Sequence, residues 1–328
     1  MTPQETSRAR FPEDGLNGLG SALAGASRRF SGKPVIFANN LKPTLHLFHA
    51  ANSICSQKVR AVLAQTQQSF ISHEMHIFAG DTYDPDHVRL RLAGCRAADL
   101  PLSTEHQGNT SAKEGGCDAC VVPTLVREES LSVIVDSLSI CLELDRTNPE
   151  KPSELAPSEH FSAILDELDT VDLLPNYQLL GNAGEPRKAA EFARQLATSK
   201  IERCDALMEA HTGDEPLERA YSAKRRKEIS AANLLFDVSS LEKAEASVHS
   251  MLKALDTRLE GRPHTYLFCS EPTLADLFWG VELIRLSDLG VMVRSGALRD
   301  VDRYLTILSE LPGIRNAVIE WPGAREMA

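Results

Sequence analysis

The pattern of apolar and polar positions divides the chain into two parts. Alternation typical of strands is confined to the first part, at 45–49, 69–78, 121–126 and 131–135. From about residue 158 onward, apolar residues recur every three or four positions, as in amphipathic helices. The clearest of these stretches are 160–174, 186–210, 240–261 and 297–311. The pattern therefore predicts an α/β first domain followed by an all-helical second domain.

The first domain is organised around residues 45–65. The alternating residues 45–49 predict a short half-buried strand, and a helix follows in which Val59, Val62 and Leu63 lie on one stripe. Because another strand is expected at 69–78, the strand–helix–strand order predicts two parallel strands joined by a right-handed crossover.

Cys55 falls in the first turn of this helix, directly after a strand. Free amide groups and the positive end of the helix dipole favour an anion there, and a thiolate is an anion. The pKa of such a cysteine can fall from ~8.5 to roughly 3.5–7.5. The hydroxyls of Ser53 and Ser56 could donate hydrogen bonds to it. The alternative is a buried structural cysteine, which is the commoner role of a free Cys.

Two further features of the first domain have both structural and functional explanations. Pro123 near the start of a strand fits a strand start or edge, because proline cannot donate to the ladder. A cis bond between Val122 and Pro123 would free the backbone of Val122 to pair with an extended ligand. Asp136 and Ser137 precede a helix, and the ordinary role of an N-cap explains either of them.

Composition shifts suggest the domain boundaries. Residues 1–40 are rich in Ser, Arg, Gly and Pro and are expected to be a mostly disordered extension. The first domain is expected at 41–147, with an insertion at 79–120, and the helical domain at 158–328. The proline-containing stretch between them fits a linker. Cys117 and Cys120 form a CxxC without a second ligand pair for zinc, so they are interpreted as two unremarkable cysteines.

Charge and cysteine usage restrict the class of protein. The net charge of −11 over 328 residues argues against nucleic acid and anionic membranes as partners. No apolar run approaches the roughly 18 residues of a membrane span. Seven cysteines without a framework pattern fit a reducing compartment, hence the cytoplasm. No metal site is predicted.

Four short motifs carry a resemblance to the glutathione S-transferase superfamily. In order along the chain they are NSICSQKVR at 52–60, VVPTL at 121–125, the acid–serine pair at 136–137 and TLAD at 273–276. The resemblance extends from Leu45 to Trp321. It implies a thioredoxin-like N-terminal domain, an all-helical C-terminal domain, glutathione as co-substrate and a homodimer, the usual assembly of the superfamily.

A narrower resemblance concerns the bacterial chlorohydroquinone reductive dehalogenases, whose members act on 2,5-dichlorohydroquinone and tetrachlorohydroquinone. It rests on SICSQKVR at 53–60, YDPDHVRLRL at 83–92, LADLFWGVELIRL at 274–286 and EWPG at 320–323. In this branch glutathione displaces chloride from the ring, and a cysteine then attacks the sulfur of the conjugate.

The resemblance implies a role for each matching residue. Ser53 would hydrogen-bond the glutathione thiolate, and Cys55 would be the second nucleophile, forming a mixed disulfide with glutathione. Val122, held by Pro123, would pair its backbone with the cysteinyl part of glutathione. The γ-glutamyl end would be bound by the remaining pair, Asp136 and Ser137.

Other functions remain open at this point. Another glutathione transferase, or a lyase that cleaves β-aryl ethers, could use Ser53 alone and carry Cys55 as a bystander. A non-catalytic binding module is a third possibility, since fold does not fix function. Tyr177, Phe278 and Trp279 are candidate aromatic residues near the ring substrate, with core packing as the alternative for the last two. Lys58, Lys113 and His106 are candidates for the glycyl carboxylate of glutathione.

Overall fold

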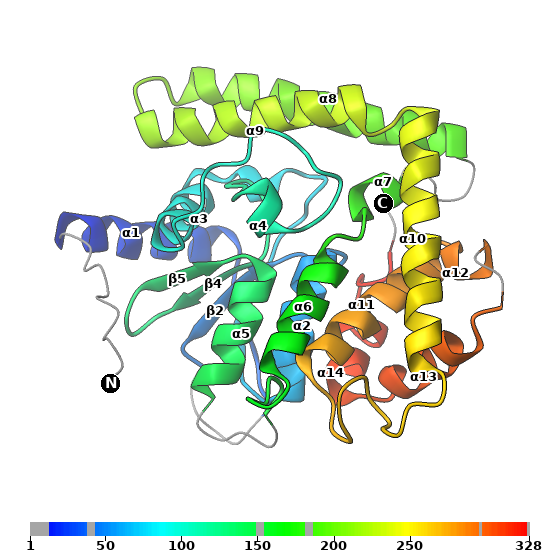
Figure 1. Ribbon diagram of the computed structural model, residues 1–328. Coiled ribbons are helices and arrows are strands. Elements are labelled where there is room, and N and C mark those ends of the chain that lie inside the picture. The colour runs from blue at the N-terminus through cyan, green and yellow to red at the C-terminus, as the bar shows by residue number, and fades with distance from the viewer. Residues whose placement is uncertain (1–12, 38–42, 149–153, 181–185, 295–296, 327–328) are drawn as a thin grey trace, which may run out of the picture.

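The computed structural model describes residues 13–37, 43–148, 154–180, 186–294 and 297–326 (Figure 1). Its first domain contains a five-stranded mixed sheet with the strand order β1-β3-β2-β4-β5. The strands are β1 (Lys33–Val35), β2 (Leu45–His49), β3 (Phe70–Glu74), β4 (Thr124–Arg127) and β5 (Ser132–Val135). Strands β2 and β3 are parallel, and β4 and β5 form an antiparallel hairpin. The parallel pairing of β2 and β3 that the sequence predicts is confirmed.

Helices cover both faces of this sheet. The helices α1 (Glu13–Arg29) and α3 (Pro85–Ala97) pack on the face that carries Phe48 and Val126. The helices α2 (Ile54–Gln65) and α5 (Ser137–Thr147) pack on the face that carries Leu47 and Leu125. All five residues of β2 are consequently buried. The prediction of a half-buried strand was wrong because the sequence did not reveal the second helical layer.

The N-terminal segment is part of this fold. Residues 1–40 were expected to be mostly disordered, but α1 packs against α3, and β1 extends the sheet by pairing antiparallel with β3. Leu19 and Leu23 of α1, and Phe30 directly after it, are buried in the core between α1 and the sheet. The expectation was therefore wrong for residues 13–37, and residues 1–12 lie outside the described part of the chain.

The segment expected to be an insertion, 79–120, contains an integral element of the domain. It holds the 3₁₀ helix η1 (Asp81–Tyr83), α3 and the short α4 (Ala112–Gly115). A disulfide joins Cys95 of α3 to Cys117, and an isolated β-bridge joins Leu102 to Cys117. The interpretation of Cys117 as an unremarkable cysteine beside Cys120 was therefore wrong, because Cys117 pairs with a residue 22 positions earlier.

The second domain is helical throughout its described residues. Its elements are α6 (Phe161–Asp172), α7 (Asn176–Leu179), α8 (Pro186–Ala210), α9 (Glu215–Leu234), α10 (Val238–Leu259), α11 (Leu274–Asp288), α12 (Val291–Arg294), α13 (Arg299–Ser309), α14 (Pro312–Ile314) and η3 (Arg315–Ile319). A capping box of Thr273 and Asp276 opens α11, which is buried almost all round. Part of the expected linker, 149–153, lies outside the described residues. In the described chain, no helix is both long and apolar enough to cross a membrane.

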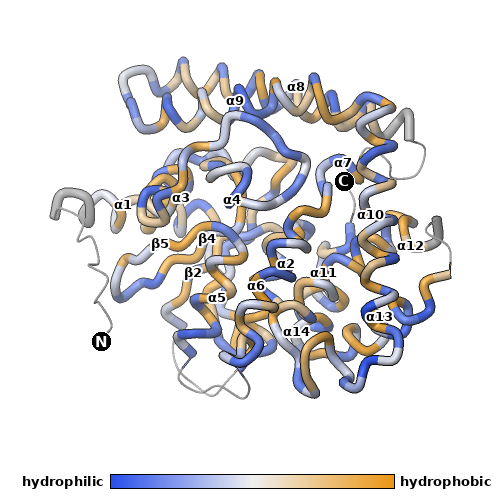
Figure 2. The backbone as a smooth tube through the Cα atoms, in the orientation of Figure 1, coloured by the Kyte–Doolittle hydropathy of each residue, from blue (hydrophilic) through white to orange (hydrophobic). Residues whose placement is uncertain are grey.

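Two contacts of the second domain position the site. Helix α2 packs against α11, so the two domains share one core. The antiparallel helices α8 and α9 pack along each other, and α9 lies against α3 of the first domain (Figure 1). Figure 2 shows hydrophilic and hydrophobic residues interleaved along α8 and α9. The buried face of α9 includes Lys224 and Glu228, which is why its apolar periodicity is weak.

Candidate active site

A cavity of about 660 Å³ opens between the two domains, a size typical of small-molecule sites. The first domain supplies one end of it, and α7, α8 and α9, together with His106 and Asp118 of the first domain, supply the other. All six site residues expected from the sequence line this cavity: Ser53, Cys55, Val122, Pro123, Asp136 and Ser137. The fold thus brings together residues that lie more than 80 positions apart in the chain.

Ser53 is the N-cap of α2. Its hydroxyl oxygen accepts a hydrogen bond of 3.3 Å from the backbone amide of Ser56. The hydroxyl proton of Ser53 therefore stays available for an anion in the cavity. Ser56 itself is buried, and its hydroxyl accepts a hydrogen bond from the amide of Ala50, so it belongs to the structure of the turn.

Cys55 is a free, partly exposed thiol at the cavity wall. Burial raises the pKa of Cys55 to about 11, against the opposing positive charge of Lys58 and the neighbouring Ser137 hydroxyl. The prediction of a low-pKa thiolate was wrong for the free protein. That prediction considered only the position of Cys55 at a helix N-terminus. The surrounding protein buries the thiol, and the carboxylates of Asp172 and Glu282 raise its pKa further.

Lys58 lies one helical turn after Cys55 and has no exposed surface. Its ammonium forms ion pairs of 2.8 Å with Asp172 and with Glu282, both buried residues of the second domain. Although burial alone would lower the pKa of Lys58, these two carboxylates hold it above its ordinary value. Lys58 therefore stays charged beneath the site and does not line the cavity as a ligand for glutathione.

Arg91 of α3 holds the loop before β4. The Val122–Pro123 peptide bond is cis, as expected. The guanidinium of Arg91 donates to the carbonyl oxygen of Pro123 at 2.5 Å and to that of Asp118 at 2.9 Å. Arg91 also lines the cavity. Its role was not predictable, because no sequence motif distinguishes a positioning arginine on an amphipathic helix.

Asp136 and Ser137, at the start of α5, also line the first-domain end of the cavity. Asp136 has a φ of +71° and caps α5, as expected. Burial raises the pKa of Asp136 above its ordinary value, while the hydrogen bond from the Ser139 amide opposes the shift. The hydroxyl of Ser137 is buried beside the thiol of Cys55, and among the described residues it makes no hydrogen bond of standard geometry. A carboxylate and a hydroxyl thus line the cavity side by side.

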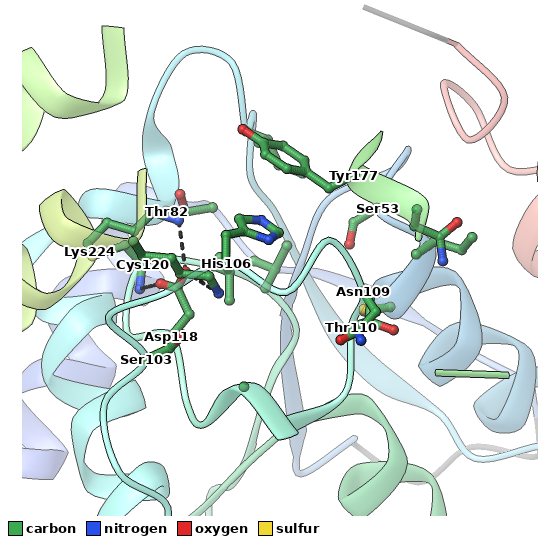
Figure 3. Close-up of a pocket in the computed structure, with 18 of the residues that line it drawn as sticks. Ser53, Thr82, Ser103, His106, Asn109, Thr110, Asp118, Cys120, Tyr177 and Lys224 are labelled. Carbon is green, nitrogen blue, oxygen red and sulfur yellow. Dashed lines mark hydrogen bonds and ion pairs between the residues drawn. The ribbon is translucent and has the colours of Figure 1, made fainter. Parts of the chain in front are cut away.

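The opposite end of the cavity holds a cluster that the sequence analysis missed. Figure 3 shows Ser53 on one side and Lys224 with Asp118 on the other, with His106 between them. The cluster consists of Asp118, Lys200, Lys224, Lys227 and Glu228. Of the aromatic candidates, Tyr177 lines the cavity, whereas Phe278 and Trp279 are buried in the core.

The comparisons with known proteins identify the family of the chain. A family model described as the C-terminal domain of glutathione S-transferase matches residues 238–317. The 2,5-dichlorohydroquinone reductive dechlorinase of Sphingobium indicum is 32% identical over 297 residues, which cover 86% of this chain and 84% of that relative. The chain belongs to the glutathione S-transferase family. The tetrachloro-p-hydroquinone reductive dehalogenase of Sphingobium chlorophenolicum is 25% identical to this transferase, covering 76% of it and 85% of that relative.

Solved structures show the same fold for this transferase. The β-etherase LigF from Sphingobium sp. strain SYK-6 aligns with a TM-score of 0.56 and 15% identity over 84% of this chain and 98% of that chain. Glutathione S-transferase III in its apo form aligns with a TM-score of 0.52 and 16% identity over 86% and 98%, respectively. The thioredoxin-like domain followed by a helical domain is confirmed, as is the expectation of an enzyme of this family.

Proposed function

We propose that this transferase is a glutathione-dependent reductive dehalogenase of chlorinated hydroquinones. The observation that supports this most strongly is the pair Ser53 and Cys55, two residues apart on one cavity wall. A hydroxyl suffices for a transferase that only conjugates glutathione. A second sulfur nucleophile beside it is required only where a conjugate must afterwards be reduced.

Glutathione would bind along the first-domain end of the cavity. The carboxylate of Asp136 would meet the ammonium of the γ-glutamyl group, and the hydroxyl of Ser137 would donate to its carboxylate. The backbone of Val122, which Pro123 follows, would pair with the cysteinyl part. This arrangement directs the thiol of glutathione toward Ser53.

The reaction would proceed in three steps. First, the glutathione thiolate, hydrogen-bonded by Ser53, displaces chloride from a tautomerised chlorohydroquinone and leaves a glutathionyl hydroquinone. Second, the sulfur of Cys55 attacks the sulfur of glutathione. The electron pair of the broken carbon–sulfur bond goes to the ring carbon, which takes up a proton. Third, a second glutathione attacks the Cys55–glutathione disulfide and regenerates the thiol.

The atoms and electrons of this scheme balance. One chlorinated ring and two glutathione molecules give the ring with hydrogen in place of chlorine, one oxidised glutathione, chloride and a proton. In the second step Cys55 loses one proton and the ring carbon gains one, so no net proton is released. The pKa of about 11 means that Cys55 carries this proton in the free protein at neutral pH.

Two further properties belong to the proposal. Members of this superfamily usually assemble as dimers, so we propose a homodimer, to be tested by sedimentation analysis.

The cysteine content suggested a cytoplasmic location, where glutathione is abundant. The Cys95–Cys117 disulfide departs from the expectation of uniformly reduced thiols. Fractionation of cells that express the native chain tests the location.

The direct test uses purified protein, glutathione and 2,5-dichlorohydroquinone. Chloride is measured by ion chromatography, and the ring product and oxidised glutathione by mass spectrometry. The proposal expects one chloride and one oxidised glutathione for each ring that loses chlorine. Glutathione binding without any loss of chloride would overturn it, and a β-aryl ether substrate assayed in parallel would then identify a lyase.

A further inference from the structure

The second-domain end of the cavity combines a flat aromatic wall with buried charge. The rings of His106 and Tyr177 stack with centroids 4.3 Å apart and an angle of 9° between their planes. Both residues line the cavity, and Figure 3 shows His106 between Ser53 and Lys224. A stacked pair of this kind offers a face against which a further aromatic ring can pack.

The hydroxyl of Tyr177 is hydrogen-bonded to two charged groups. The ammonium of Lys200 donates to it at 3.0 Å, and the hydroxyl in turn donates to Glu228 at 3.3 Å. The same ammonium lies 4.8 Å from the centre of the Tyr177 ring. The ammonium of Lys200 therefore lies at the hydroxyl edge of the aromatic wall, and the Tyr177 proton is already donated to Glu228.

At this end of the cavity, the charge of Lys224 is more fully compensated than that of Lys200. The ammonium of Lys224 lies 2.8 Å from Asp118 and 2.7 Å from Glu228, so two carboxylates neutralise it. Lys227 adds an ion pair of 3.2 Å with Asp118. Lys200 is 3.5 Å from Glu228, its single ion-pair partner in the described chain.

This end of the cavity therefore carries more positive than negative charge, with Lys224 buried and Lys200 and Lys227 partly exposed. Three ammonium groups face the two carboxylates of Asp118 and Glu228, and Glu105 at the rim is exposed to solvent. Although burial alone would raise the pKa of Glu228, Lys224 and Lys200 lower it to about 2, so this carboxylate is ionised. Burial lowers the pKa of Lys200. An anion bound beside Lys200 would oppose that effect and offset part of the cost of burying the cation.

We propose that the ammonium of Lys200, at the hydroxyl edge of Tyr177, forms a subsite for an ionised ring oxygen, a phenolate, of the aromatic substrate. The ring packs against the stacked pair of His106 and Tyr177. This inference deepens the proposed function and rests on it for the identity of the ring, but the subsite itself can be measured without glutathione or turnover. Lys200 is accordingly a specificity-determining residue that selects hydroxylated rings in their ionised form.

The test uses 4-nitrophenol, whose ionised form has its own absorption band. The probe is titrated with pH in the presence of excess protein, without glutathione. The expected result is a fall of about one unit in the pKa of the bound probe, which equals a roughly tenfold preference for phenolate over phenol. Lys200→Met is expected to abolish the shift and Lys200→Arg to retain it.

Two controls separate the subsite from general effects. Lys253→Met removes an exposed lysine of α10 outside the cavity lining and should leave the shift unchanged. The uncharged analogue 4-nitroanisole should bind wild type and Lys200→Met equally, which shows that the variant keeps its cavity. An unshifted probe in wild type, or an equal shift in Lys200→Met, would contradict the proposal.

Two outcomes distinguish the phenolate subsite from a glutathione-binding role of Lys200 and from the proposed dehalogenase activity. If Lys200→Met loses affinity for glutathione while the probe shift persists, Lys200 binds a carboxylate of glutathione and the phenolate subsite is rejected. If the probe shifts through Lys200 but 2,5-dichlorohydroquinone keeps its chlorine, the subsite stands and the proposed dehalogenase activity fails.

Discussion

The carboxylate of Asp136 accepts two hydrogen bonds of 3.0 Å from Ser139, one from its backbone amide and one from its hydroxyl. Asp136 thereby caps α5 while it also lines the cavity. Its structural and proposed binding roles coincide in one side chain. A substitution can nevertheless separate them, because asparagine also serves as an N-cap and tolerates the positive φ of this position.

We expect Asp136→Asn to weaken glutathione binding about 10- to 100-fold with little change in melting temperature. The cap survives, but the charge that would bind the ammonium of glutathione is lost, and a hydrogen bond to a charged group contributes roughly 1.5–3 kcal/mol. Calorimetric titration with glutathione measures the effect. Asp136→Ala is the comparison, since it loses the cap as well. Unchanged affinity in Asp136→Asn would remove Asp136 from the glutathione site.

The reactivity of Cys55 should rise steeply with pH. With a pKa of about 11, the thiolate fraction grows roughly tenfold for each pH unit between 7 and 9. The rate of alkylation by iodoacetamide should follow it without reaching a plateau. The measurement is made on the Cys269→Ser variant, because Cys55 and Cys269 are the free cysteines that are not fully buried. A plateau already at neutral pH would mean that the thiol is acidic after all.

Lys58→Met should destabilise the protein by about 3–5 kcal/mol, because it leaves Asp172 and Glu282 as buried carboxylates without their cation. Urea unfolding gives the free energy of unfolding. Adding Asp172→Asn to the variant should recover part of the loss, whereas Lys253→Met, at an exposed position, should change little. A loss of stability as small as that of the surface variant would show that the ion pairs do not hold the two domains together.

Reduction of the Cys95–Cys117 disulfide should destabilise the protein by about 3 kcal/mol, because the bond closes a loop of about 22 residues. A phosphine reductant is expected to lower the melting temperature of wild type but not that of Cys95→Ser. Calorimetry of both proteins with and without reductant makes the comparison. If the reductant acts equally on both, the bond does not form in the protein used.

The residues near the start of α2 and α5 were predictable from sequence because short motifs carry them. Ser53, Cys55 and Asp136 each lie at the junction of a strand and a helix, where local sequence determines geometry. The pKa of Cys55 was not predictable, because it depends on Asp172 and Glu282, which approach only through domain packing.

The second-domain end of the cavity was hidden for a different reason. On α9, Lys224 and Glu228 occupy the buried stripe together with Leu217 and Tyr221. In sequence, such a stripe is indistinguishable from a solvated helix face, because the pairing that satisfies the charges comes from other elements. The packing of α1 against α3 was not predicted either, because its buried Leu19 and Leu23 stand among glycine and serine residues that suggested a mostly disordered segment.

The most direct test of the two-sulfur mechanism compares wild type with Cys55→Ser during turnover of 2,5-dichlorohydroquinone with glutathione. Both proteins should release chloride, because Ser53 and glutathione are intact. Wild type should yield the dechlorinated ring and oxidised glutathione, whereas Cys55→Ser should accumulate the glutathionyl hydroquinone. Formation of the dechlorinated ring by Cys55→Ser at the wild-type rate would contradict the role of Cys55 as the second nucleophile.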